Sequence, residues 1–288
     1  MQDLAPGPAL PPRFVIRPRI SPTQIQQLRK REVLILMRKI LAAFSVMLLL
    51  GASGLAQQNP GTIASLEFQT PKSGMAKQYE DGRKQKAEWH KQQKDSQPLM
   101  VWETITGDHT GTYIVGRLGQ HWADFDKPSV PEQSDIDEYN KVIGAYVQSL
   151  VTRYYEFLPK ISKPLDSPLP TKYSEIITYV LRPGKAEDFR AAIARITEGI
   201  EKTKWPVHYF WYALATGGSN DTYVLVIPHA NWADLEDKPD RKPFPEMLKD
   251  AFGQAEADSL TKRLDSATER ETNEMVQFRP DLSYLPNK

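Results

Sequence analysis

The sequence predicts an α+β fold built from two tandem units of the same kind, and three observations support this prediction. First, Thr112 and Thr222 stand 110 positions apart (222 − 112), and Tyr113/Tyr223, Trp122/Trp232 and Asp124/Asp234 repeat at the same offset. Second, both copies show the same succession of strand and helix patterns. Third, 288 residues with 40% hydrophobic and 25% charged content suffice for a sizeable globular core.

Composition excludes several functional classes. The formal net charge of +1 argues against a nucleic-acid binder, which usually carries a strong basic excess. The chain contains no cysteine, so it forms no disulfide, thiolate metal site or cysteine nucleophile. This composition is compatible with an oxidising compartment but does not define one.

The N-terminal region predicts export. Residues 1–36 are rich in proline and arginine and are expected to form a disordered extension, with Met37 as an alternative start. Residues 37–56 have a basic start, a short apolar run and small residues before a cleavage site after Ala56, the pattern of a signal peptide. The alternative is a membrane anchor, but a spanning helix needs about 20 apolar residues. We therefore expect a periplasmic or secreted protein without a stable membrane anchor.

The first unit is predicted over residues 62–158. Its expected elements are a strand at 64–70, a helix at 75–94, strands at 99–105 and 112–118, a helix at 132–149 and a strand at 151–158. This β-α-β-β-α-β order is that of a ferredoxin-like unit.

A proline-rich linker at 159–173 precedes the second unit, predicted over residues 174–288. Its expected elements are a strand at 174–181, a helix at 186–202, strands at 207–214 and 222–227, a helix at 245–269 with a break near Gly253, and a strand at 272–279. The sequences at the ends of the two units are also similar, since residues 156–162 match residues 277–283. Each repeat is therefore a whole ferredoxin-like unit.

Two such units, whose third strands lead into His121-Trp122-Ala123-Asp124 and Asn231-Trp232-Ala233-Asp234, resemble the dimeric α/β-barrel superfamily. That superfamily includes NIPSNAP-like proteins and antibiotic-biosynthesis-type monooxygenases. The resemblance implies two four-stranded antiparallel sheets that face each other and close one barrel. A sheet with helices on one face needs a partner for the other. Here the second repeat is the expected partner, giving a monomeric pseudo-dimer, with a homodimer through outer edges as the alternative.

Aromatic residues on the second strand of each repeat are the candidate ligand-binding residues. Because side chains alternate along a strand, some of them must face the barrel interior in either register. The candidates for a small aromatic or apolar ligand are Trp102, His208, Phe210, Trp211 and Tyr212. The alternative is ordinary core packing. His208, Tyr212 and Glu103 are the candidate catalytic groups, on the expectation that they line the barrel.

No cofactor or metal is expected. The five histidines show no metal-ligand spacing, and the chain lacks a nucleophile elbow, a Walker loop and a dinucleotide fingerprint. Haem-degrading members of the superfamily use an Asn/Trp/His set. Neither 65–68 nor 175–178 on the first strands contains such an asparagine, which counts against haem chemistry.

The first helix of repeat 1 lacks the apolar stripe of its counterpart. At the 110 offset, Arg83, Lys86 and His90 replace three isoleucines. Because burying unpaired charge is costly, we expect this helix to turn and bury Met75, Tyr79, Gly82 and Trp89 instead; the alternative is a polar cluster against the sheet.

Three functions remain open from the sequence. The first is a ligand-binding module with an apolar barrel interior. The second is a cofactor-independent monooxygenase-like or isomerase-like enzyme. The third is a purely structural or assembly protein that uses its sheet edges.

Overall fold

The structure, a computed structural model, describes residues 61–167, 169–219, 221–238 and 241–286. The fold described below belongs to the unit Pro60–Lys288. The predicted N-terminal extension and signal peptide lie outside the described residues. Within the described part, no helix is long and apolar enough to cross a membrane.

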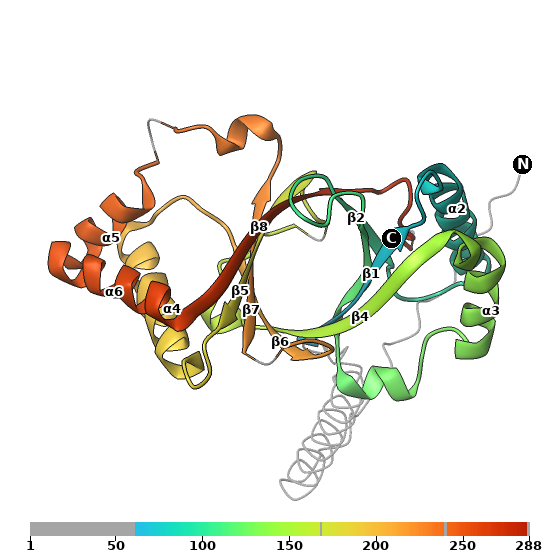
Figure 1. The fold of residues 1–288 in the computed structure, drawn as a ribbon, viewed down its shortest axis with the longest axis horizontal. Coiled ribbons are helices and arrows are strands. Elements are labelled where there is room, and N and C mark those ends of the chain that lie inside the picture. The colour runs from blue at the N-terminus through green and yellow to red at the C-terminus, as the bar shows by residue number, and fades with distance from the viewer. Residues whose placement is uncertain (1–60, 168, 220, 239–240, 287–288) are drawn as a thin grey trace, which may run out of the picture. The chain divides into compact units, whose positions relative to one another are not determined.

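Two successive sets of strands and helices make up the described chain (Figure 1). The first set is β1 (Ile63–Pro71), α2 (Ala76–Gln92), β2 (Met100–Thr104), β3 (Tyr113–Gln120), α3 (Glu132–Val142) and β4 (Val147–Phe157). The second set is β5 (Tyr173–Leu181), α4 (Ala186–Thr203), β6 (Phe210–Thr216), β7 (Thr222–His229), α5 (Phe244–Phe252), α6 (Gln254–Ala267) and β8 (Thr268–Phe278). Short 3-10 turns lie at Trp122–Asp126, Gly144–Tyr146, Pro159–Ile161 and Trp232–Leu235. The expected helix break at Gly253 is confirmed.

The eight strands close one barrel in the order β1-β3-β2-β8-β5-β7-β6-β4. The first set (β1–β4) and the second set (β5–β8) form the two halves of the barrel. The halves pair with each other at two seams: Trp102 of β2 lies opposite Phe278 of β8, and Phe157 of β4 lies opposite Tyr212 of β6. Every neighbouring pair is antiparallel. Closure leaves no open sheet edge, and the α+β barrel predicted from the two units is confirmed.

Strand β4 begins earlier than the sequence predicted. The helix expected over 132–149 ends at Val142, and β4 pairs with β1 from Val147 onward. The ladder to β1 satisfies the backbone of residues that would otherwise extend the helix. Leu150, which directly follows the predicted helix, is a strand residue and is exposed.

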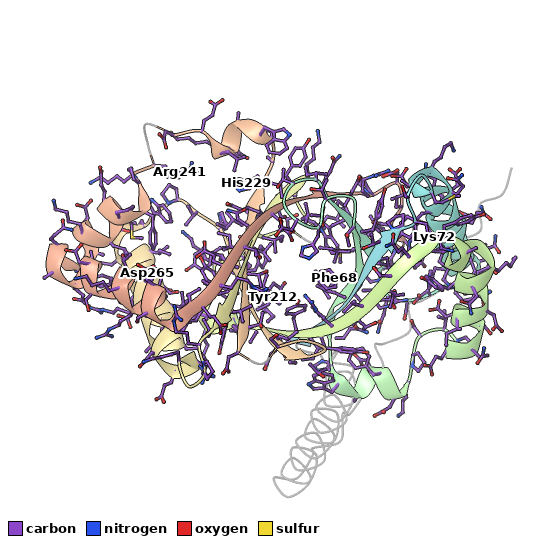
Figure 2. All side chains as sticks on the ribbon, viewed as in Figure 1. Phe68, Lys72, Tyr212, His229, Arg241 and Asp265 are labelled. Carbon is purple, nitrogen blue, oxygen red and sulfur yellow. The ribbon has the colours of Figure 1, made fainter. Side chains whose placement is uncertain are left out.

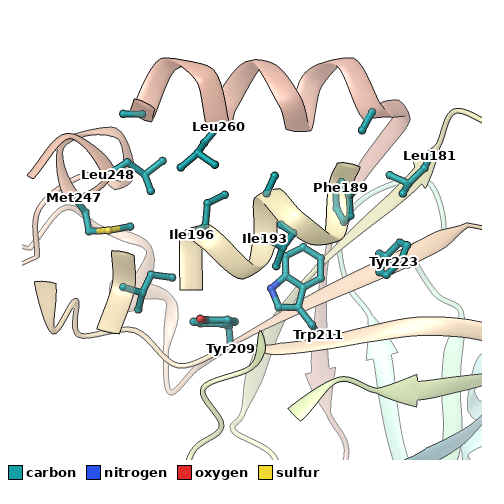
Figure 3. Packing of buried hydrophobic residues seen from close by; sticks show 14 residues of the cluster. Leu181, Phe189, Ile193, Ile196, Tyr209, Trp211, Tyr223, Met247, Leu248 and Leu260 are labelled. Carbon is teal, nitrogen blue, oxygen red and sulfur yellow. The ribbon is translucent and has the colours of Figure 1, made fainter. Parts of the chain in front are cut away.

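In the second half, α4 covers the outer face of the barrel with an apolar stripe (Figure 3). Phe189, Ile193, Ile196 and Ile200 are buried as predicted. They belong to one core with Trp211 and Tyr223 of the strands and Met247, Leu248 and Leu260 of α5 and α6. Burying an aliphatic or aromatic side chain of this size contributes about 1.5–3 kcal/mol, so this layer holds the second half together.

In the first half, the prediction that α2 turns away its charged face is wrong. Arg83, Lys86 and His90 are buried, whereas Met75 is exposed and Trp89 is only half-buried. Of the residues expected inside, Tyr79 and Gly82 are buried. The helix therefore keeps the orientation of α4 and places a polar cluster where its counterpart places isoleucines. The apolar core of this half is smaller and centres on Tyr79, Val101, Tyr113, Val115 and Ile143.

The segment after β4 reaches over the second half. The backbone N–H of Leu158 donates to the carbonyl of Trp211 over 2.8 Å. In return, the N–H of Trp211 donates to Ser162 Oγ over 2.8 Å. Ile161 packs on the α4 core. Residues 158–162, most of which belong to the predicted linker, therefore bind to the second half, and we call this segment a strap.

The segment after β8 makes the same contacts with the first half. The N–H of Arg279 donates to the carbonyl of Val101 over 2.8 Å, and the N–H of Val101 donates to Ser283 Oγ over 2.9 Å. Leu282 is fully buried in the core of the first half. Each half therefore ends in a strap that packs on the other half and completes its outer layer.

Candidate functional site

The register decides which side chains face the barrel interior. On β6, Trp211 packs in the helix-covered core, so its neighbours Phe210 and Tyr212 face inward. Directly opposite residues of antiparallel strands share a face. Phe157, opposite Tyr212, therefore also faces inward.

Three aromatic rings gather on one wall of the interior. The ring of Phe157 lies 6.2 Å from that of Phe210 and 5.4 Å from that of Tyr212, measured between centroids. Burial raises the pKa of Tyr212 to about 12. The phenol is therefore protonated at neutral pH and can donate a hydrogen bond inside the barrel.

Inward-facing residues are not fully packed, although strands surround them. The half-buried set includes Leu66, Phe68, Ile114, Ile176, Thr178, Phe210, Tyr212, Val224 and Val226. Figure 2 shows Phe68 and Tyr212 projecting into the ring of strands. A residue inside a closed barrel that keeps accessible surface borders space that water can enter. Eight-stranded barrels are just wide enough either to be filled by side chains or to hold one small ligand.

The wall at the β2–β8 seam is packed more tightly. Trp102 faces inward as its register requires, with its ring 5.8 Å from that of Phe278. Together with Met100 and Val276 it forms a buried cluster. Trp102 therefore lies at the closed side of the interior, away from the half-buried aromatic wall.

The sequence candidates do not assemble into one site. Trp211 belongs to the outer core. Glu103, expected to line the barrel, instead lies opposite Tyr113 on the helix-covered face, where Arg279 Nη1 donates to it over 2.5 Å. His208 precedes β6, is exposed, and has its Nδ1 3.0 Å from the carbonyl of Pro164. Glu103 lies outside the barrel because alternation gives two faces but does not say which one the helices cover. His208 has the parity of the inward-facing Phe210 and Tyr212 but precedes the first residue of β6.

Sequence reasoning missed Arg153, a charged residue on the inward face of β4. It lies on β4 opposite Leu66, one inward position from Tyr155 and two from Phe157. Its guanidinium carbon is 5.0 Å from the ring centroid of Phe68. The available signal was an arginine among Val151, Tyr155 and Phe157 on one strand face.

A second polar site lies outside the barrel, beneath α2. His90 Nδ1 is 2.9 Å from Asp95 Oδ2, and His90 Nε2 is 3.4 Å from Asp135 Oδ1. Neither contact has the angle of a good hydrogen bond. Lys86 donates to the backbone carbonyl of Asp135 over 2.6 Å, and its Nζ is 2.8 Å from the Asp135 carboxylate. We call Lys86, His90, Asp95, Arg117 and Asp135 the buried charge cluster.

Two pKa shifts follow from this packing. Burial lowers the pKa of His90, since it disfavours the imidazolium, although Asp95 opposes this shift. Burial alone would raise the pKa of Asp95. The close contact with His90 and hydrogen bonds from Ser129, the Gln97 backbone and Arg117 outweigh it and hold that pKa well below its usual range. His90 and Asp95 are almost fully buried, so the cluster has a structural role rather than access to a substrate.

No metal site is evident in the part of the chain that the structure describes: no group of three or more His, Cys, Asp or Glu side chains is placed to hold an ion. The repeated aspartates have a local role. Asp124 accepts the backbone N–H of His121, and Asp234 that of Ala230, each over 2.7 Å. They tie down the turn after the third strand of each half.

Neither a protein-family model nor a curated protein sequence matches the chain. The described strands close one antiparallel barrel with helices outside (Figure 1), which is the fold that the resemblance implied. Similar solved structures include a Lactobacillus acidophilus NCFM protein provisionally named a monooxygenase (TM-score 0.47, 8% identity, covering 78% of this chain and 97% of that one). An anthrone oxidase-like protein has TM-score 0.47 and 10% identity, covering 81% and 96%. A chlorite dismutase mutant of Candidatus Nitrospira defluvii has TM-score 0.45 and 10% identity, covering 78% and 93%. Similarities this distant carry no argument about activity.

Proposed function

We propose that the protein binds a small, flat, largely apolar molecule inside its barrel. The observation that carries this proposal is the wall of Phe157, Phe210 and Tyr212, whose rings are in contact and yet half-buried within a closed barrel. Aromatic faces supply large contact area for a planar ligand. The protonated phenol of Tyr212 would orient one polar group of that ligand.

Binding is favoured over catalysis by the placement of the candidate groups. Of the three proposed catalytic residues, Tyr212 alone faces the interior, while Glu103 and His208 lie elsewhere. A general base must lie within hydrogen-bond reach of the proton that it removes. The high pKa of Tyr212 makes it a poor base at neutral pH, so we assign the barrel a binding role.

The evolutionary and cellular parts of the proposal rest on the sequence. We propose that the barrel is a duplicated ferredoxin-like unit, because the element order and the strap contacts recur in both halves. We also propose that residues 37–56 direct export, with cleavage after Ala56. N-terminal sequencing of protein purified from its own host would read Gln57 first, whereas a retained Met1 or Met37 would exclude this cleavage.

The binding proposal is tested by native mass spectrometry on protein purified from its own host, followed by release of any bound molecule in denaturant. We expect one small molecule per chain. As a complementary assay, N-phenyl-1-naphthylamine, a neutral aromatic probe that fluoresces in apolar surroundings, should bind saturably. A barrel that retains no molecule and shows no saturable binding of this probe would overturn the proposal.

A further inference from the structure

Arg153 is an inward-facing cation without a counter-ion. Its Nε is buried and has no hydrogen-bond partner, and none of the ion pairs among the described residues includes it. Its known neighbours are the face of Phe68 and the phenol of Tyr155. A partly desolvated charge in this state gains free energy when an anion joins it.

The β6–β7 turn fixes the place of Arg153. Gly217 has φ of +98°, and a Cβ there would come within 2.5 Å of the Thr152 carbonyl oxygen and 3.0 Å of Arg153 Cα. The turn thus lies directly against β4 at this residue. Since β2 and β6 run in the same direction around the barrel, their following turns lie at the same barrel end, and Arg153 lies beside that end.

The second half offers an internal comparison. Glu274 of β8 holds the position equivalent to Arg153, against the β2–β3 turn at Gly107. Its carboxylate accepts the backbone N–H of His109 over 3.1 Å and lies 2.7 Å from His109 Nδ1. The charge of the second half is therefore satisfied within the protein, whereas the charge of the first half is not.

Building on the proposed binding function, we propose that the barrel ligand is an acid whose single oxyanion group binds Arg153 while its apolar rings lie on Phe157, Phe210 and Tyr212. The guanidinium offers a planar fork of donors that matches carboxylate or sulfonate geometry. Arg153 and the aromatic wall are connected along β4, because Arg153, Tyr155 and Phe157 occupy successive inward positions. One planar acid can therefore contact both.

The test uses two probes that differ by one charge. 1-Anilinonaphthalene-8-sulfonate carries an anionic group on the ring system of the neutral N-phenyl-1-naphthylamine. Arg153→Gln should weaken sulfonate binding at least about tenfold, the usual effect of losing a hydrogen bond to a charged group, and change neutral-probe binding less than about twofold. Arg190→Gln, which removes an exposed arginine from the outer helix α4, is the charge-matched control and should change neither.

The possible results distinguish a failure of the anion-site proposal from a failure of the proposed binding function. If Arg153→Gln leaves sulfonate binding intact while Phe210→Ala weakens both probes, the barrel binds ligands without an anion site and the inference is wrong. If Phe210→Ala affects neither probe, the barrel is not the binding site and both proposals fall. Should Arg153→Gln fold poorly by circular dichroism, Arg153→Lys replaces it. A lysine lacks the bidentate fork, so equal sulfonate affinity in a folded Arg153→Lys protein would exclude guanidinium recognition.

Discussion

The phenol of Tyr284 donates a hydrogen bond of 2.6 Å to the backbone carbonyl of Asp95, a contact between residues 189 positions apart. The same ring stacks on His90 with 5.7 Å between centroids. The strap that follows β8 therefore closes the buried charge cluster from outside.

The charge cluster should be a major source of stability in the first half. Asp95 accepts hydrogen bonds from Arg117 over 2.7 Å and from Ser129 over 2.6 Å. Asp95→Asn preserves shape but leaves these donors and His90 without a carboxylate, so we expect unfolding free energy to fall by about 3–5 kcal/mol. Urea titration followed by circular dichroism measures this loss. Asp81→Asn, on the exposed face of α2, is the matched control, and an equal loss there would contradict the buried-pair explanation.

The cluster should also make stability pH-dependent. Because folding lowers the pKa of His90, the unfolded chain binds a proton that the folded chain does not at pH below about 6.5. Stability is therefore fully present above about pH 6.5 and decreases as the pH falls through the lowered pKa. The groups facing His90 are Asp95, Asp135, Lys86, Arg117 and Tyr284.

Urea midpoints between pH 7.5 and 4.5 test this dependence. His90→Gln removes the titrating ring, so its midpoint should fall less steeply with acid than that of the wild-type protein, even though its stability is lower throughout. His208→Gln, which alters an exposed histidine, should keep the wild-type slope. An unchanged slope in His90→Gln would assign the acid sensitivity to other groups.

The strap exchange predicts strong coupling between the chain's end and its first half. Leu282 is fully buried among Tyr79, Val101 and Tyr113. Leu282→Ala should therefore lower unfolding free energy by about 2–5 kcal/mol through lost burial and a cavity. Leu235→Ala, at an exposed leucine, should change it by less than about 0.5 kcal/mol. If both variants unfold at the wild-type urea concentration, the strap does not support the core.

The sequence predicted the order of strands and helices well because local patterns encode it. The apolar stripe of α4 at Phe189, Ile193, Ile196 and Ile200 is readable from spacing alone. The burial of Lys86 and His90 was not, since their partners Asp95 and Asp135 come from two other segments. Spacing within a helix shows that a face is charged, but it does not show which distant residues neutralise it.

The same limit applies to the barrel. Alternation separates Phe210 and Tyr212 from Trp211, but the choice of inward face depends on where α4 packs. His208 lies outside the barrel because β6 begins after it, and periodicity does not define where a strand begins. Arg153 could have been singled out, because it interrupts an apolar strand face, but only the closed barrel shows that this face is the interior.

Phe210 and Trp211 are adjacent in sequence, but we expect their replacement by alanine to have different effects on stability and on ligand binding. Trp211 is buried against Phe189, with 5.9 Å between ring centroids, so Trp211→Ala should cost about 3–5 kcal/mol of stability. Phe210 is half-buried in the interior, so Phe210→Ala should cost less stability but weaken N-phenyl-1-naphthylamine binding by about 1–3 kcal/mol, or roughly fivefold to a hundredfold. Probe fluorescence and urea unfolding on the same samples measure both effects. Since the two side chains point to opposite faces of one strand, equal effects of both substitutions on binding and on stability would contradict the assigned barrel interior.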